Sequence, residues 1–406
     1  MAIDPFRVRV SGPLSAFAIG FVDKLVQQGY RPRVTCNHMR LLAHLSQWLG
    51  SQGLGAGDLY VSEMERFLRA RRAVGYTNLL SIKAMQPILA FLRDLGVAPL
   101  PPLLMSSGPV ETMLERYCHY LTVERGLGSG TVRGYVDTVR LFLQGRISPD
   151  GLALELADLT AAEVIAFVVR RCPQQGQSAA KLTVTALRSL LGFLHVDGTI
   201  VQSLAAAVPS VAGRRLSGLP KGLDPDQVRR LLASCDSRTP NGCRDLAVLT
   251  ILVRLGLRAD EVARLALDDI DWRAGEIIVH GKANCTDRLP LPTDVGEAVV
   301  AYLRCGRPAS TRGRTVFVRI KAPHRSLSSS GVTQIVAAAA RRAGLGQIHA
   351  HRLRHTAATQ MLRAGASLPE IGQLLRHRRA LTTAIYAKVD RDRLRTIARP
   401  WPGEVA

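Results

Sequence analysis

Six side chains in the second half of this 406-residue chain are of types that act on a phosphodiester. They occur in four patterns that follow one another: LGLRADEVARL, GKANCTDRLPL, HAHRLRHTAATQML and LLRHRRALTTAIYAKV. The patterns supply two arginines, one lysine, two histidines and one tyrosine: Arg258, Lys282, His351, Arg354, His377 and Tyr386. Gathered around one phosphorus atom, these groups can carry out phosphoryl transfer.

Each type of group has a defined part in that chemistry. A pair of arginines grips the non-bridging oxygens of a phosphodiester and favours the five-coordinate transition state, in which negative charge grows on those oxygens. A tyrosine hydroxyl has a pKa of about 10, but neighbouring cations make its phenolate more accessible and a histidine accepts the proton. Lys282, expected at a hairpin tip, is a candidate to protonate the leaving alkoxide. The route needs no cofactor or metal, and it predicts a phosphotyrosyl intermediate that another hydroxyl reverses.

The local spacings favour this assembly. His351 and Arg354 are three residues apart, so they share one face if the segment is helical. Glu261 lies three residues beyond Arg258 and is expected to brace its guanidinium. The distance from His377 to Tyr386 leaves room for a helix end, a turn and a new helix.

Taken singly, each residue has a simpler interpretation. Arg258 alone is typical of a surface or salt-bridged arginine, Lys282 of a solvated loop charge, and Tyr386 of a half-buried packing residue. The HRR sequence at 377–379 is compatible with a basic surface patch. His351 and His355 resemble an HxxxH zinc pair, but the glutamate of the HExxH motif is absent, which disfavours zinc. The order and joint occurrence of the four patterns favour the catalytic interpretation.

These motifs resemble those of the tyrosine recombinases, the phage-integrase family, over roughly residues 220–395. HRLRHTAAT is similar to the family's H-x-x-R box, LLRHRRALTTAIYAKV to its His-then-Tyr box, and LGLRADEVARL to its first arginine box. The resemblance implies that Tyr386 is the nucleophile that joins to a DNA 3′-phosphate, and that Arg258 and Arg354 stabilise the transition state. It also implies that His351 is a general base or acid. Lys282 would donate a proton to the 5′ oxygen, and His377 would bind the scissile phosphate.

The same resemblance implies how such a protein works. Family members act on double-stranded DNA as tetramers on paired sites and exchange strands through a four-way Holliday junction without ATP or metal. The segment after the tyrosine commonly docks on a neighbouring subunit. A homotetramer is therefore expected, with partner recombinases as an alternative, because some transposon integrases act in sets. Arg376 departs from the family pattern, since a small glycine usually precedes the second histidine.

The elements that must position these residues are mostly helical. The sequence GEIIVHGKANCTDRLPLP predicts a hairpin with arms at Ile277–His280 and Arg288–Leu291. Apolar residues at helical spacing predict the helices that follow: Asp294–Leu303, Gly331–Ala343, Leu353–Ala364, Leu368–Leu375 and Ala380–Tyr386. The predicted fold class is mainly α with a small β-hairpin or sheet in the C-terminal domain.

Two Pro/Gly/Ser-rich stretches, Ala98–Pro109 and Val208–Pro225, divide the chain into residues 1–100, 107–208 and 220–406. The last part is the expected catalytic domain. Residues 107–208 resemble the family's helical, SAM-like core-binding domain, which would clamp the duplex together with the catalytic domain. Residues 1–100 parallel residues 107–208 in three blocks in the same order, as in ILAFLRDLG against LLGFLHVDG. They are expected to be a second core-binding-like module or a partner-binding module.

Charge and composition agree with a partner that is a polyanion. The formal net charge is +22, and residues 211–406 hold 33 basic against 17 acidic residues. Aromatic residues make up only 5%, which argues against a base-stacking platform for single strands. The seven cysteines contain no C-x-x-C pair. No apolar run is long enough for a membrane span and no signal peptide is evident, so a cytoplasmic protein without membrane partners is expected.

The sequence therefore predicts a site-specific DNA recombinase or integrase, of the kind that mobile elements use for integration and transposition. Two alternatives remain open. A relaxing enzyme similar to type IB topoisomerases would use the same chemistry, and only exchange between two paired sites separates the two activities. A catalytically inactive DNA-binding relative would keep the fold without cleaving DNA.

Overall fold

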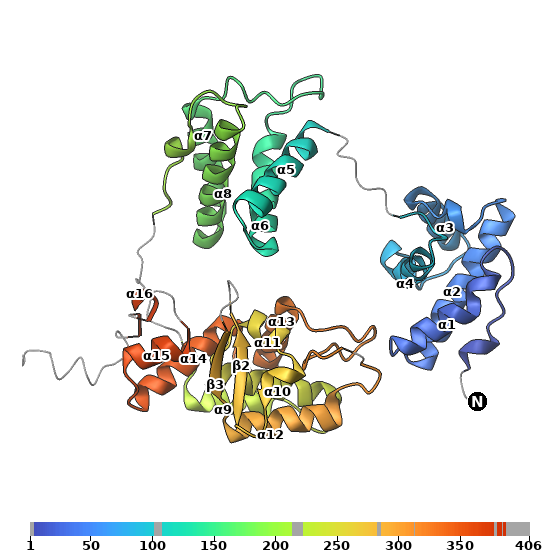
Figure 1. Ribbon diagram of the computed structural model, residues 1–406. Helices are drawn as coiled ribbons and strands as arrows, with labels where there is room; N and C mark the ends of the chain where they lie inside the picture. Colours follow the sequence, from blue (N-terminus) through green and yellow to red (C-terminus); the bar gives the residue numbers. More distant parts are fainter. Residues whose placement is uncertain are drawn as a thin grey trace, which may run out of the picture. The chain divides into compact units, whose positions relative to one another are not determined.

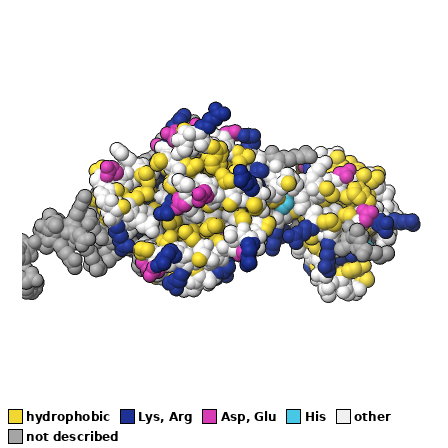
Figure 2. All heavy atoms as spheres, turned by 90° about the horizontal axis from the view of Figure 1, so that it is seen from below, with side chains coloured by type: hydrophobic (Ala, Val, Ile, Leu, Met, Phe, Trp, Pro, Cys, Tyr) yellow, Lys and Arg dark blue, Asp and Glu magenta, His cyan; other side chains and the backbone are white. Residues whose placement is uncertain are grey.

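The computed structural model describes residues 4–100, 108–212, 222–281, 286–311, 313–376, 380–383 and 385–386. Contacts group the chain into two units, Leu100–Arg215 and a second made of Met1–Pro99 and Leu216–Ala406. Separate hydrophobic cores form within residues 14–98, within residues 110–208 and within residues 223–353. Figure 1 traces the helices and strands of these parts, coloured along the sequence. Lys and Arg side chains recur over the face seen in Figure 2, among apolar and uncharged side chains.

The first module, residues 4–98, contains four helices. They are α1 (Ala18–Gln27), α2 (Pro32–Ser51), α3 (Val61–Ala73) and α4 (Ile82–Asp94). Pro32 occupies the first turn of α2, where its missing N–H costs no hydrogen bond. Ser81 caps α4 by accepting a hydrogen bond from the backbone N–H of Ala84. Apolar side chains at helical spacing on all four helices build the core.

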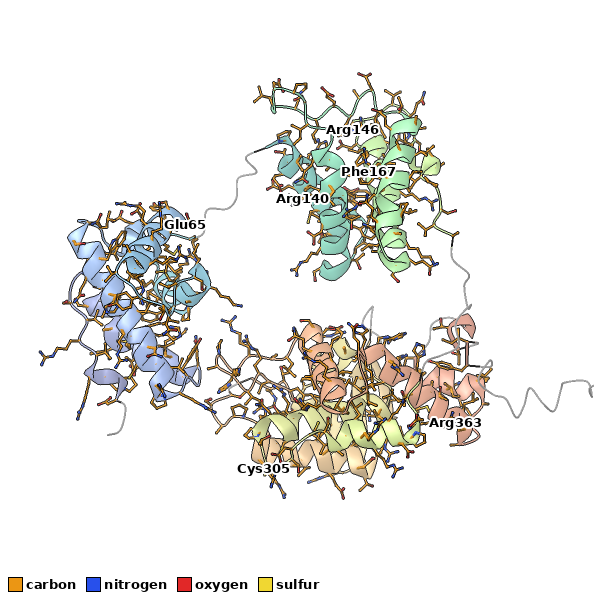
Figure 3. All side chains as sticks on the ribbon, turned by 180° about the vertical axis from the view of Figure 1, so that it is seen from behind. Glu65, Arg140, Arg146, Phe167, Cys305 and Arg363 are labelled. Atoms are coloured by element: carbon orange, nitrogen blue, oxygen red, sulfur yellow. The ribbon has the colours of Figure 1, made fainter. Side chains whose placement is uncertain are left out.

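The second module, residues 108–212, also contains four main helices. They are α5 (Pro109–His119), α6 (Ser129–Gln144), α7 (Ala161–Arg171) and α8 (Gln177–Val196), with a π-helical turn at Tyr120–Glu124. Thr160 and Glu163 form a capping box that starts α7. Arg146 donates a hydrogen bond to Glu163 at 2.6 Å. The Phe167 ring packs edge-on against Phe142; Arg146 and Phe167 are labelled in Figure 3.

The third module begins at residue 222. Its helices are α9 (Pro225–Ala233), α10 (Pro240–Arg254), α11 (Ala259–Arg264), α12 (Thr293–Ala301), α13 (Ser329–Arg342), α14 (Ala350–Arg363), α15 (Leu368–Leu374) and α16 (Ala380–Thr383). A three-stranded antiparallel sheet has the order β1 (Ile270–Asp271), β2 (Glu276–His280) and β3 (Thr286–Pro290). Short 3₁₀ and π turns complete the described chain: Pro5–Arg7, Ser15–Phe17, Ala56–Asp58, Cys172–Gln174, Ala205–Ala207, Leu267–Asp269 and Tyr302–Gly306.

The sheet and helices agree with the predicted fold class. The hairpin pairs Ile277 with Leu289 and Ile278 with Arg288, so one face of β2 enters the core. Its second arm begins at Thr286, before the predicted Arg288, and the two-residue strand β1 was not predicted. The helix predicted over 380–386 is shorter, because α16 ends at Thr383. No helix in the described ranges has both the length and the apolar character to cross a membrane.

Candidate active site

Four of the six predicted catalytic residues, together with Glu261, lie in the described part of the chain. Arg258 directly precedes α11, His351 and Arg354 lie on α14, and Tyr386 follows α16. Lys282 and His377 fall outside the described residues. The described residues lie on elements that are far apart in sequence, so their meeting depends on the packing of α10, α11, α14 and α15.

Glu261 fixes Arg258 at the start of α11. The backbone at Arg258 is extended, with φ −75° and ψ 151°, so the helix begins at the next residue. One oxygen of Glu261 accepts a hydrogen bond from the Arg258 backbone N–H at 2.7 Å, and the other accepts from the Arg258 guanidinium at 2.6 Å. The Glu261 side chain is only 2% exposed, whereas that of Arg258 is 40% exposed. Glu261 therefore fixes the orientation of the Arg258 guanidinium from the protein interior, while the guanidinium remains accessible to solvent.

Arg354 is held more deeply. Its side chain donates to the backbone carbonyls of Gly256, at 2.6 Å, and Leu375. Gly256 has φ +59°, and a Cβ there would lie 2.6 Å from Leu375 Cδ2, so the close approach requires glycine. Burial and the nearby charge of Arg258 lower the pKa of Arg354 to about 10. The guanidinium is still cationic at neutral pH and has little freedom to rotate.

Arg376 connects both arginines to one turn after α15. Its backbone adopts φ +55°, the left-handed conformation that a glycine accommodates without strain, which explains why this position favours glycine. The carbonyl of Arg376 accepts a hydrogen bond from Arg258 at 3.4 Å, next to the Leu375 carbonyl that binds Arg354. The Arg376 side chain is 8% exposed and pairs with Glu261 at 2.5 Å. Its Nε lies 3.8 Å from a carboxylate oxygen of Asp287 on β3.

Tyr386 meets α14 at His355. The Tyr386 hydroxyl lies 2.8 Å from His355 Nδ1, and the two ring centroids are 5.6 Å apart. Tyr386 is 1% exposed and packs with Leu362 and Ile371 in a small apolar cluster. Burial raises the pKa of Tyr386 to about 12, although the charge of Arg354 acts in the opposite direction. The phenol is therefore protonated at neutral pH in this arrangement.

The two histidines of α14 are both poor bases here. Burial, followed by the charges of His351 and Arg354, lowers the pKa of His355 to about 4. Partial burial, Arg354 and Arg258 also lower the pKa of His351, which packs edge-on against His355 at 4.5 Å. Both rings are neutral at neutral pH, so each presents one nitrogen that can accept a proton.

Sequence reasoning missed two contacts at this site. His355 had been considered only as a zinc ligand, yet it is the residue that meets the tyrosine hydroxyl. Asp287 was not predicted as a site residue, because its contact with the site depends on Arg376. The position of His355 one turn after His351 was the available signal. Within the described ranges, no group of three or more His, Cys, Asp or Glu side chains is arranged to hold a metal ion.

Comparisons with known proteins identify the family. Residues 221–393 match the model of the phage integrase family, and residues 114–198 match the model of the phage integrase N-terminal SAM-like domain. The putative integrase/recombinase y4rA of Sinorhizobium fredii (strain NBRC 101917 / NGR234) is 43% identical over 97% of this chain and 96% of the relative. The tyrosine recombinase XerD of Listeria monocytogenes serotype 4b (strain F2365) is 32% identical over 70% of this chain and 96% of the relative.

Solved structures agree on the fold. A lambda integrase tetramer bound to a Holliday junction matches with a TM-score of 0.53 at 19% identity, over 82% of this chain and 91% of that one. The XerH site-specific recombinase bound to palindromic difH substrate matches with a TM-score of 0.53 at 18% identity, over 82% of this chain and 93% of that one. The predicted family and fold class are thereby confirmed. The chain belongs to the phage integrase family, the tyrosine recombinases.

Proposed function

We propose that this protein is a site-specific DNA recombinase that cuts and rejoins strands through a 3′-phosphotyrosyl intermediate. The Tyr386 oxygen attacks the phosphorus, the bond to the 5′ oxygen breaks, and a second 5′ hydroxyl later reverses the reaction. One observation carries the proposal: the Tyr386 hydroxyl contacts His355, the residue that directly follows Arg354 on α14. The proposed nucleophile thus contacts the helix that carries a proposed transition-state cation, one residue along from it.

The charges of the described residues support this division of labour. Arg258 and Arg354 hold the two non-bridging oxygens, where negative charge grows in the transition state. Burial, followed by the charges of Arg354 and Arg258, lowers the pKa of His351, and an entering phosphodiester anion offsets the part due to the two charges. His351 then becomes the better proton acceptor for the phenol. We assign protonation of the 5′ oxygen to Lys282 and binding of the scissile phosphate to His377, on the motifs of the family alone.

The proposal extends to assembly and setting. By likeness to the tetramer on a Holliday junction, we infer a homotetramer on two DNA sites, with strand exchange through a junction. Residues 107–208 and 220–406 act as the core-binding and catalytic domains, because the two family models match within them. We place the protein in the cytoplasm as the recombinase of a mobile element.

Tyr386→Phe tests the chemistry directly. The substrate is a nicked duplex taken from the DNA that flanks the gene, which traps the cleaved strand. We expect the parent protein to give a covalent protein–DNA adduct that survives denaturant, and the variant to give none while it binds the duplex as tightly as the parent. An adduct in the variant would identify another nucleophile. Exchange between two paired sites would separate recombination from simple relaxation.

A further inference from the structure

The first module, residues 4–98, lies outside both matched family models, which begin at residues 114 and 221. Its four helices nevertheless follow the same order as those of the second module, with α1 to α4 corresponding to α5 to α8. Both modules place a glycine of positive φ after the first helical segment, Gly29 and Gly126, and another after the last helix, Gly96 and Gly198. The two modules therefore reverse the chain direction at corresponding positions, in addition to sharing the order of their helices.

Twelve buried positions of the first module match buried positions of the second. When the sequence blocks are superposed, a buried residue of the first module falls on a buried residue of the second: Phe21 on Tyr117, Leu25 on Leu121, Thr35 on Val132, Leu42 on Val139, Leu59 on Leu159, Met64 on Val164, Leu68 on Val168, Met85 on Leu187, Ile88 on Leu190, Leu89 on Leu191, Phe91 on Phe193 and Leu92 on Leu194. Chance resemblance of amphipathic helices would not keep this register across four helices. The first module has the architecture of a second SAM-like domain.

The surfaces of the two modules differ in charge. Residues 1–100 contain 12 Lys and Arg against 6 Asp and Glu, whereas residues 101–212 contain 9 of each. The basic excess of the first half of the chain therefore belongs to the first module. Its helix α2 contains no acidic residue at all.

One polar stripe runs along α2, with successive members three or four residues apart: Arg33, Asn37, Arg40, His44 and Gln47. Arg33 and Arg40 are exposed, and neither has an ion-pair partner among the residues that the structure describes. Two other cations of the module already have carboxylate partners, since Arg7 pairs with Asp4 and Lys24 with Asp94. The equivalent positions of α6 carry no cation: Gly130, Gly134, Asp137, Leu141 and Gln144.

We propose that this α2 stripe binds the phosphate backbone of a second stretch of duplex DNA, outside the segment held by the second and third modules. Two free guanidiniums two helical turns apart, with an amide donor between them, suit a row of phosphates. The stripe contains no apolar side chain to anchor a protein partner. The inference rests on the proposed function in that both assume duplex DNA as substrate, but it does not require cleavage.

The test uses the full chain with Arg33→Glu and Arg40→Glu combined. Binding to a random duplex of about 60 base pairs is measured by fluorescence anisotropy over a series of salt concentrations. Each lost phosphate contact lowers the slope of log affinity against log salt by about 1. We expect the slope to fall by about 2 and the affinity to fall with it.

A matched control reverses the same amount of charge on the same module. Arg7→Glu with Lys24→Glu removes two cations that already have carboxylate partners, so its slope should stay close to that of the parent. An equal fall in salt slope and affinity in both double variants would overturn the proposal, because net charge alone would then explain the effect. Arg33→Gln with Arg40→Gln should give the same slope as the glutamate variant if folding is intact.

The outcome is separable from the chemistry of Tyr386. Adduct formation on a nicked duplex too short to reach α2 should be the same in the α2 variant and the parent. If that adduct never forms, the proposed function fails while the salt slope still decides the role of α2. An unchanged slope with loss of assembly on paired sites would show that the stripe binds protein, and would overturn the proposal.

Discussion

At the scale of single residues, His355 and Tyr386 are both neutral at neutral pH. Burial is the largest cause on both sides, since it raises the pKa of the phenol to about 12 and lowers that of the imidazole to about 4. The 2.8 Å contact between them then joins two uncharged groups. Catalysis has to change this environment, because the phenol is protonated and a histidine with so low a pKa is a weak base.

The depressed pKa of His355 predicts a pH-dependent stability. An unfolded histidine has a pKa of about 6.5, so between pH 6.5 and 4 the unfolded chain takes up a proton that the folded chain excludes at this site. Folding stability should therefore fall as the pH drops through that window. In His355→Gln, the loss in free energy of unfolding between pH 7 and pH 4.5 should be smaller than in the parent by about 1 to 3 kcal/mol. Denaturant unfolding at the two pH values measures this loss.

Tyr386→Phe is the matching control for that measurement. It leaves His355 half-buried and removes only the hydroxyl, so most of the pH dependence should persist. If Tyr386→Phe abolished the dependence as completely as His355→Gln, the hydrogen bond rather than burial would be the cause.

At the scale of elements, the turn after α15 organises the site. The consecutive carbonyls of Leu375 and Arg376 accept hydrogen bonds from Arg354 and Arg258, and the Arg376 side chain returns to Glu261. One turn thus contacts both arginines of the site as well as the carboxylate behind one of them. The left-handed backbone at Arg376 exposes these carbonyls to α14 and α11 at a local cost of about 1 kcal/mol.

Substitution of Arg376 separates the backbone of this turn from its side chain. Arg376→Gly keeps the left-handed conformation but removes the ion pair with Glu261, so we expect single-turnover cleavage to slow by about tenfold, as for loss of a charged hydrogen bond. DNA affinity should not change. Arg376→Lys should recover part of the rate, and Arg376→Ala should be less stable than the glycine variant by about 1 kcal/mol. A glycine variant as fast as the parent would show that the side chain only packs.

The same elements show how far the sequence predicts the structure. The hairpin is predictable because its apolar and β-branched run alternates, and the contact of Arg258 with Glu261 follows from their three-residue spacing. Strand β1 is too short to give a pattern. The contact between His355 and Tyr386 spans 31 residues and depends on how α15 and α16 turn back, which local spacing does not encode. The fold class and family were predictable, whereas the contact partner of the Tyr386 hydroxyl was not.

At the scale of the whole molecule, the excess of cations governs encounter with DNA. A formal charge of +22 favours binding to any DNA duplex, whatever its base sequence. Non-specific affinity should therefore fall by about a thousandfold or more between about 50 and 200 mM salt if six or more phosphates are contacted. Filter binding or anisotropy on random duplexes measures this directly. An affinity that does not respond to salt would contradict backbone recognition.

The burial of Tyr386 has a consequence for the cell. With 1% of its surface exposed, the phenol cannot reach a backbone phosphorus until the segment that carries it moves. A lone copy travelling along a chromosome would then leave the strands intact wherever it pauses. Breakage would then require binding or assembly to uncover the ring, which would limit stray nicks in the DNA that the protein contacts.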